Sequence, residues 1–275
     1  MPLIPLNLPS GQYRNGTEYQ SQGRWRDGNL IRWHEGALRP IGGWRQRGTV
    51  DLNGVARTMV AWEDNSNNRR VAFGTHNKLY AMTAGNAISD ITPAGFTAGR
   101  VDATAFTGYS SSTFGGGLYG LPSEDIGNIL RATTWSLENW GEYLLGCTAD
   151  DGKIYEWQLD GATPAAVLSN APTSCSSMMV TEERFVFAFG ASGDPRKVAW
   201  SDRENNNLWT PAATNEAGDI QIQTNGVILA GLRTRGQSLI LTDQDAHTAT
   251  YSGPPYVYGF ERVGTSCGLI AANAA

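Results

Sequence analysis

The side chains that could hold a metal or act as nucleophiles are few and scattered. Each of the three histidines, at positions 34, 76 and 247, is isolated, without the i+4 histidine or neighbouring glutamate of a zinc-binding helix. The cysteines, at 147, 175 and 267, are odd in number and show no Cys-x-x-Cys spacing. We therefore predict no metal site, no cofactor and no disulfide framework, with the cysteines reduced or buried as small side chains.

Pairs of acidic residues are the remaining candidates for catalysis, because two carboxylates can hydrolyse a glycosidic bond. The candidate pairs are Glu124–Asp125, Asp150–Asp151, Glu182–Glu183 and Asp243/Asp245. All lie in turn-like contexts, where solvated carboxylates are expected in any soluble β protein. The sequence also lacks a Gly-x-Ser-x-Gly elbow and a Gly-x-x-x-x-Gly-Lys phosphate loop. We predict that the protein is not an enzyme, has no catalytic residues and does not hydrolyse glycans.

Two further stretches resemble ligand-binding loops but lack residues that such loops need. Asp64–Asn68 begins like a calcium loop, yet it has no glycine at the sixth position and Thr75 stands at the twelfth. Gly115, Gly117 and Gly120 match Gly-x-Gly-x-x-Gly, but neither a strand pattern before them nor a helix pattern after them is present. We interpret the first as a turn and the second as part of a glycine-rich insertion at about 106–122.

Hairpins are the elements that would position these residues. Asp151-Gly152 separates two apolar runs within Glu142–Trp157, and glycine readily adopts the positive φ that such a turn requires. The same pattern recurs at Val71–Met82, Phe185–Trp200 and Leu239–Tyr251. We expect each hairpin to lie in a separate sheet.

The spacing of the hairpins favours one architecture. Leu79, Ile154, Val198 and Ala249, one from each second strand, are 75, 44 and 51 residues apart. A four-stranded propeller blade takes about 40–50 residues, and the longest interval contains the glycine-rich insertion. We predict an all-β fold, a β-propeller-like array of antiparallel four-stranded blades, and leave open whether the array is incomplete in this chain. A single irregular β-sandwich is the alternative. Residues 123–141 are interpreted as a short helix or the outer strand of a blade.

Composition and charge divide the chain. It has 275 residues, 33 glycines and only 17% charged residues, a turn-rich β-type composition. Residues 1–50 hold seven arginines against three acidic residues, a balance of +4 in a chain whose net charge is −5. We expect an N-terminal arm and basic hairpin in 1–50 and a propeller-like domain in 51–275. The first residues lack the pattern of a signal peptide, and no apolar run approaches the roughly 20 residues of a membrane span.

The basic hairpin contains a strand at Leu30–Trp33, bracketed by Asp27-Gly28 and Glu35-Gly36. Arg24 and Arg26 alternate with Trp25, which places the arginines on one face. Such a pattern can stack on nucleic-acid bases. An ordinary hairpin with a solvated arginine face is the interpretation that we favour.

Together these motifs resemble a known family. Gly23–Trp33, then Gly36–Trp44, Trp200-Ser-Asp with Trp209, Leu239–Asp243 and Tyr251–Pro255 are similar to the tail nozzle proteins of tailed bacteriophages, the tail tubular B and packaged-DNA-stabilisation types. The resemblance implies a virion structural protein, made in the host cytoplasm, whose propeller subunits form a ring, a hexamer in that family. It also implies contacts with other tail and adaptor proteins and transient, non-specific passage of DNA during ejection.

Specific residues follow from this hypothesis. We expect contacts between subunits at Arg24, Arg26, Trp33, Arg39 and Trp44, with the basic fifty residues meeting the acidic remainder of a neighbour. Tyr109, Phe114 and Tyr119 are candidates for a loop that projects into the channel. The alternative for this loop is that it covers a blade edge. The alternative function is a tail-associated propeller that binds host surface glycans, with or without glycosidase activity.

Overall fold

The computed structural model describes residues 8–43, 45–48, 50–103 and 131–274. The chain divides into two compact units, Met1–Thr49 and Val50–Ala275. Within the described residues the regular structure is β-strand, apart from one 3₁₀ turn at Ala191–Gly193. None of the described segments is a helix long and apolar enough to cross a membrane.

The first unit is built around one hairpin. Strands β1 (Ile31–His34) and β2 (Ala37–Pro40) pair antiparallel, with His34 opposite Ala37. Glu35 and Gly36 form the connection, with φ of 51° and 75°. Positive φ at both positions is typical of the tight turn whose twist matches that of the flanking strands. The predicted strand between the two turn signals is therefore present, shifted by one residue.

The second unit contains four antiparallel sheets of four strands each. The first sheet comprises β3 (Thr58–Glu63), β4 (Arg69–Gly74), β5 (Leu79–Thr83) and β6 (Ile88–Asp90). The second comprises β7 (Trp135–Trp140), β8 (Tyr143–Thr148), β9 (Ile154–Trp157) and β10 (Ala166–Val167). The third comprises β11 (Ser177–Val180), β12 (Val186–Phe189), β13 (Lys197–Trp200) and β14 (Gly218–Gln221). The fourth comprises β15 (Ile228–Thr234), β16 (Gln237–Thr242), β17 (Asp245–Gly253) and β18 (Val257–Thr265).

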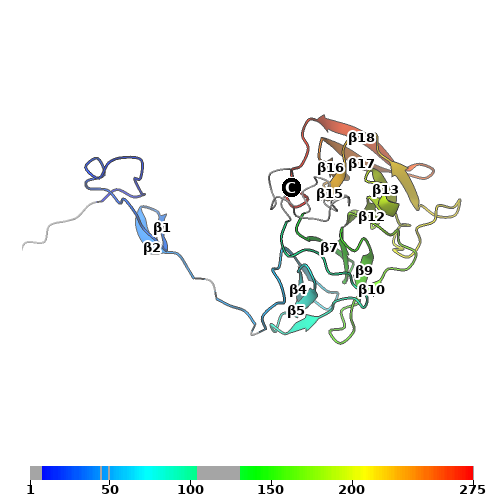
Figure 1. The fold of residues 1–275 in the computed structure, drawn as a ribbon, viewed down its shortest axis with the longest axis horizontal. Helices are drawn as coiled ribbons and strands as arrows, with labels where there is room; N and C mark the ends of the chain where they lie inside the picture. The colour runs from blue at the N-terminus through cyan, green and yellow to red at the C-terminus, as the bar shows by residue number, and fades with distance from the viewer. Residues whose placement is uncertain (1–7, 44, 49, 104–130, 275) are drawn as a thin grey trace, which may run out of the picture. The chain divides into compact units, whose positions relative to one another are not determined.

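Every sheet is a meander in which strands adjacent in sequence are adjacent in space. The four predicted hairpins are the central pairs β4–β5, β8–β9, β12–β13 and β16–β17, one in each sheet. Figure 1 shows the sheets following one another from β4 and β5 to β15–β18. The predicted all-β, propeller-like array of four-stranded blades is confirmed, and the single sandwich is wrong.

The interpretation of residues 123–141 as a helix or an outer strand is wrong where the structure describes them. Trp135–Trp140 form β7, the first strand of the second sheet. First strands contact one another in the order β3, β7, β11 and β15, so they form the centre of the array. Both faces of β7 pack against other sheets, and for this reason its apolar residues do not follow the simple alternation of a half-exposed strand.

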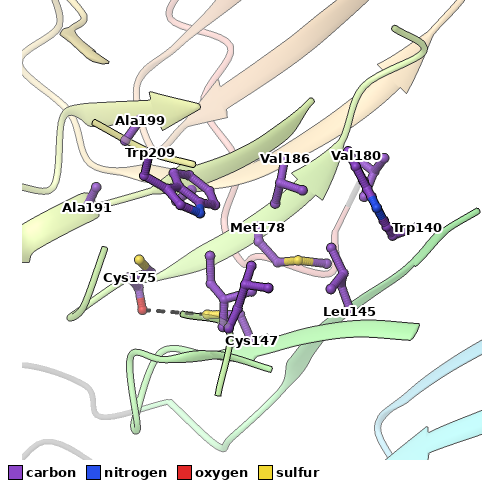
Figure 2. Close-up of a cluster of buried hydrophobic side chains, with 13 residues drawn as sticks. Trp140, Leu145, Cys147, Cys175, Met178, Val180, Val186, Ala191, Ala199 and Trp209 are labelled. Carbon is purple, nitrogen blue, oxygen red and sulfur yellow. Dashed lines mark hydrogen bonds between the residues drawn. The ribbon is translucent and has the colours of Figure 1, made fainter. Parts of the chain in front are cut away.

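The core lies between consecutive sheets. Figure 2 shows the second and third sheets, with Trp140, Leu145 and Cys147 facing Met178 and Val186. Between the first and second sheets, the indole N–H of Trp135 donates to the carbonyl oxygen of Thr75 at 2.8 Å. Buried aromatic side chains of this size contribute much of the stability of a packed interface, and their N–H groups require a partner.

In three of the sheets, a buried threonine stands at the end of the second strand, where the turn to the third strand begins. Thr75, Thr148 and Thr242 are at most 1% exposed. Their hydroxyl groups accept the backbone N–H of Lys78, Asp151 and Asp245 at 3.0, 3.4 and 2.8 Å. This capping satisfies turn N–H groups that would otherwise lack a partner. The three threonines stand at equivalent places in the sequence, and this recurrence is a signal by which such turns can be recognised.

In three of the sheets, the segment that follows the fourth strand is hydrogen-bonded to the turn between the second and third strands of that sheet. The backbone N–H of Gly99 donates to the carbonyl of His76 at 2.8 Å, and that of Cys175 to Gly152 at 2.9 Å. Likewise, the N–H of Cys267 donates to the carbonyl of Gln244 at 3.1 Å. The path from one sheet to the next is therefore set by backbone hydrogen bonds.

Candidate functional site

The predicted contact residues of the first unit differ in their surroundings. The guanidinium of Arg24 lies 5.2 Å from the centre of the Tyr13 ring, and Arg26 is 2.8 Å from Glu18. Trp33 packs against Trp25 with ring centres 5.8 Å apart. The structure therefore assigns these three residues contacts within their own unit. Trp44 lies outside the described residues.

Arg39 is exposed and stands opposite Arg32 across β1 and β2. Neither arginine makes an ion pair with a described carboxylate. Like charges directly opposite each other on a strand pair are unfavourable. The pair therefore forms a basic surface for which the described chain supplies no counter-charge.

Two of the three tryptophans in this unit contain a polar group without a partner. The indole nitrogens of Trp25 and Trp33 are buried without a hydrogen-bond partner. An indole N–H is solely a donor, and leaving it buried and unpaired is costly.

The candidate channel residues Tyr109, Phe114 and Tyr119 lie outside the described residues, but the segments on either side are described. The backbone N–H of Arg100 donates to the hydroxyl of Thr133 at 2.7 Å, and that of Thr133 to the carbonyl of Arg100 at 3.1 Å. Asp150 binds both residues, with its carboxylate 2.9 Å from the Arg100 guanidinium. The two ends of the insertion are therefore joined to each other and to the β8–β9 turn.

We expect deletion of residues 108–120 to leave the fold intact, because the joined ends at Arg100 and Thr133 do not depend on the deleted segment. The far-UV circular dichroism spectrum should be unchanged and the melting temperature nearly so. Adding Asp150→Ala to the deleted chain should lower the melting temperature, since it removes the residue that holds both ends. Loss of cooperative unfolding on deletion alone would show that the loop itself is structural.

The acidic pairs correct one prediction. The side chain of Asp151 is only 1% exposed, although we predicted a solvated turn. Burial raises the pKa of Asp151. The hydrogen bonds from Tyr155 and Thr97 and the contact with Lys153 together lower the pKa by more than burial raises it, so the net shift is downward. Asp245 is also buried and accepts the hydroxyl of Thr224 at 2.8 Å, while His247 is 3.2 Å away. These carboxylates are hydrogen-bonded parts of turns.

The carboxylates of Glu182 and Glu183 also accept hydrogen bonds from other parts of the fold. Glu182 accepts the backbone N–H of Gly236 at 3.1 Å, and Glu183 accepts the hydroxyl of Tyr258 at 3.2 Å. Glu124 and Asp125 lie outside the described residues. Asp64 accepts the backbone N–H groups of Ser66 and Asn68, as expected of a turn.

The three cysteines form no disulfide in the described part of the chain. Cys147, Cys175 and Cys267 are free, and the first two are buried. Burial raises the pKa of Cys147, and it raises that of Cys175 to about 12. Residues 8–43, 45–48, 50–103 and 131–274 contain no group of three potential ligands that could hold a metal ion.

Comparisons with known proteins give only distant likenesses. A scan against known protein families finds no match, and a search of curated proteins finds none either. Virginiamycin B lyase from Staphylococcus aureus is 8% identical over 74% of this chain and 54% of its own, with a TM-score of 0.42. A catalytically inactive form of that lyase with quinupristin is 10% identical over 83% and 60%, with a TM-score of 0.43.

The extracellular domain of a hybrid two-component system from B. thetaiotaomicron is 12% identical over 81% of this chain and 30% of its own, with a TM-score of 0.36. This chain therefore spans little more than half the length of the lyase chains. Likenesses of this size carry no information about activity.

Proposed function

We propose that this chain is a structural subunit of a ring in the tail nozzle of a tailed bacteriophage, through which DNA is retained and conducted. The observation that carries the proposal is the first unit, which has surface groups without partners. Arg32 and Arg39 are exposed and face each other across β1 and β2 without a described counter-charge. Carboxylates of a neighbouring subunit would supply that counter-charge.

Charge supports the same contact. The net charge of the chain is −5 and the first fifty residues carry +4, so the other 225 residues carry −9. Contact between the basic unit of one subunit and the acidic unit of the next is head-to-tail, and such contacts close into rings when the rotation permits. Complementary charge increases the association rate and fixes orientation. An acidic channel wall would also hold DNA weakly, because it repels phosphates.

The glycan-binding alternative has less support. Exposed tryptophans at loop ends would indicate a sugar-binding surface. In the second unit, however, Trp62, Trp135, Trp140, Trp157, Trp200 and Trp209 are all buried, each at most 8% exposed. Their position between or within sheets indicates a structural role. Absence of enzymatic activity stays a prediction.

We expect the protein to form a ring whose mass, measured by light scattering after size-exclusion chromatography, is a multiple of 29.7 kDa. Replacing both Arg32 and Arg39 with glutamate should dissociate the ring without changing the circular dichroism spectrum. High salt should act in the same direction, because it screens exposed charges.

Arg235→Glu is the matched control. Arg235 is an exposed arginine in the β15–β16 turn of the second unit and should be dispensable for assembly. A monomeric wild-type protein at micromolar concentration would contradict the proposal. If Arg235→Glu dissociated the ring as much as the double variant did, the wild-type protein would still be a ring. The conclusion that the basic surface of the first unit holds the ring together would then be rejected.

A further inference from the structure

A pocket of about 400 Å³ lies where the first strands of the four sheets meet. Its wall includes Met59 of β3, Ser136 to Glu138 of β7, Ser177 and Met178 of β11, and Leu232 of β15. Pockets that bind small organic molecules commonly have volumes of about 300–1,000 Å³ and are mostly apolar with a few polar groups. This pocket has that size, and its lining is divided about equally between polar and apolar groups.

The polar groups of the pocket are incompletely satisfied. Ser177 is 5% exposed, and its hydroxyl has no hydrogen-bond partner. Glu138 accepts the backbone N–H of Val180 at 3.2 Å through one carboxylate oxygen. No described lysine, arginine or histidine forms an ion pair with Glu138. Burial raises its pKa, with opposing contributions from the Val180 N–H and from Arg233.

The apolar wall is accessible. Met59 is 66% exposed and Leu232 is 37% exposed, although both lie on strands at the centre of the array. Met178, by contrast, is buried. Methionine side chains are flexible and polarizable, and they adapt to ligands of different shapes. These residues would contact the apolar body of a bound molecule.

We propose that this pocket binds a small organic amine, with the ammonium group on Glu138 and the apolar body against Met59 and Leu232. Glu138 is the single ionisable side chain among the residues that line the pocket. Glu138 is partly buried. A carboxylate in such a position is stabilised by an opposite charge, which an ammonium group provides together with N–H donors. The hydroxyl of Ser177 can accept a further N–H. The site is independent of ring formation.

Three probes of one shape and different charge test the site: benzylamine, benzyl alcohol and benzoate. Titration calorimetry of the full chain at neutral pH should show that benzylamine binds most tightly and benzoate does not bind. Glu138→Gln should weaken the binding of benzylamine by about 10- to 100-fold, which is the range for loss of a hydrogen bond to a charged group. The affinity for benzyl alcohol should hardly change.

Glu261→Gln, on the exposed outer strand β18, is the matched control and should leave benzylamine binding unchanged. Met59→Trp is a second variant that should fold normally, because Met59 is exposed, and should weaken binding of all probes by filling the pocket. Absence of benzylamine binding at millimolar concentration would overturn the proposal. So would equal benzylamine affinity in the wild type and Glu138→Gln, or benzoate binding as tight as that of benzylamine.

Discussion

Replacing Gly152 with alanine should destabilise the second unit strongly. Gly152 has φ of +68°, and a Cβ atom there would lie 2.7 Å from the Cα of Ser174. The left-handed backbone costs a non-glycine residue about 1–2 kcal/mol. Crowding against packed atoms adds about 1–3 kcal/mol. The neighbouring backbone cannot easily move away, because the N–H of Cys175 donates to the Gly152 carbonyl at 2.9 Å.

The free energy of unfolding in urea measures this effect, and Gly236→Ala is its control. Gly236 also has positive φ, +75°, but a Cβ atom there would meet nothing within 4 Å. The control should therefore show only the backbone cost, of about 1–2 kcal/mol. Equal losses for the two variants would mean that the contact between the β8–β9 turn and the segment at Ser174 does not constrain the fold.

The second large effect is expected at Trp135. Its side chain is 2% exposed and stacks on Phe96 with ring centres 5.1 Å apart, in addition to the hydrogen bond with Thr75. Trp135→Ala should lower the free energy of unfolding by about 3–5 kcal/mol, as large aromatic-to-alanine changes in cores do. Since domains are stable by about 5–15 kcal/mol, much of the protein could then unfold at moderate temperature.

Trp135→Phe separates the contributions. It keeps most of the apolar contact but leaves the Thr75 carbonyl without its donor, which should cost about 1–3 kcal/mol. Met59→Ala, at an exposed position of the neighbouring strand β3, should change stability by no more than about 0.5 kcal/mol. Thermal unfolding followed by circular dichroism gives all three values. A loss at Met59 comparable with that at Trp135 would contradict the assignment of the core to the interface between sheets.

The hairpins could be predicted because their signals are local. Asp151-Gly152 specifies a turn through the conformational freedom of glycine, and the apolar runs on either side specify strands. The spacing of four such units then predicts the architecture. This information is contained in short windows, so the central pairs of all four sheets were found.

The first strands and the pocket were not predicted, because their environment is set by distant segments. In residues 135–140 the three apolar side chains are buried and the polar ones partly buried, and this apolar pattern does not distinguish a strand from a helix. Glu138 and Ser177 are 39 positions apart in the sequence and line the same pocket only because their sheets are neighbours. Likewise, the burial of Asp151 and Asp245 depends on partners that pack over the turns.

The serial arrangement of strands has a consequence for how the protein is made. Each strand pairs with its neighbour in sequence, so most of the loops that must close within a sheet are short and their entropy cost is small; residues 201–217, between β13 and β14, form the longest. A sheet can therefore form as soon as its fourth strand has left the ribosome, before later sheets exist. The hydrogen bonds from Gly99 to His76 and from Cys175 to Gly152 then direct the emerging chain towards the position of the next sheet. Synthesis from one end builds the array in the order in which its sheets stack.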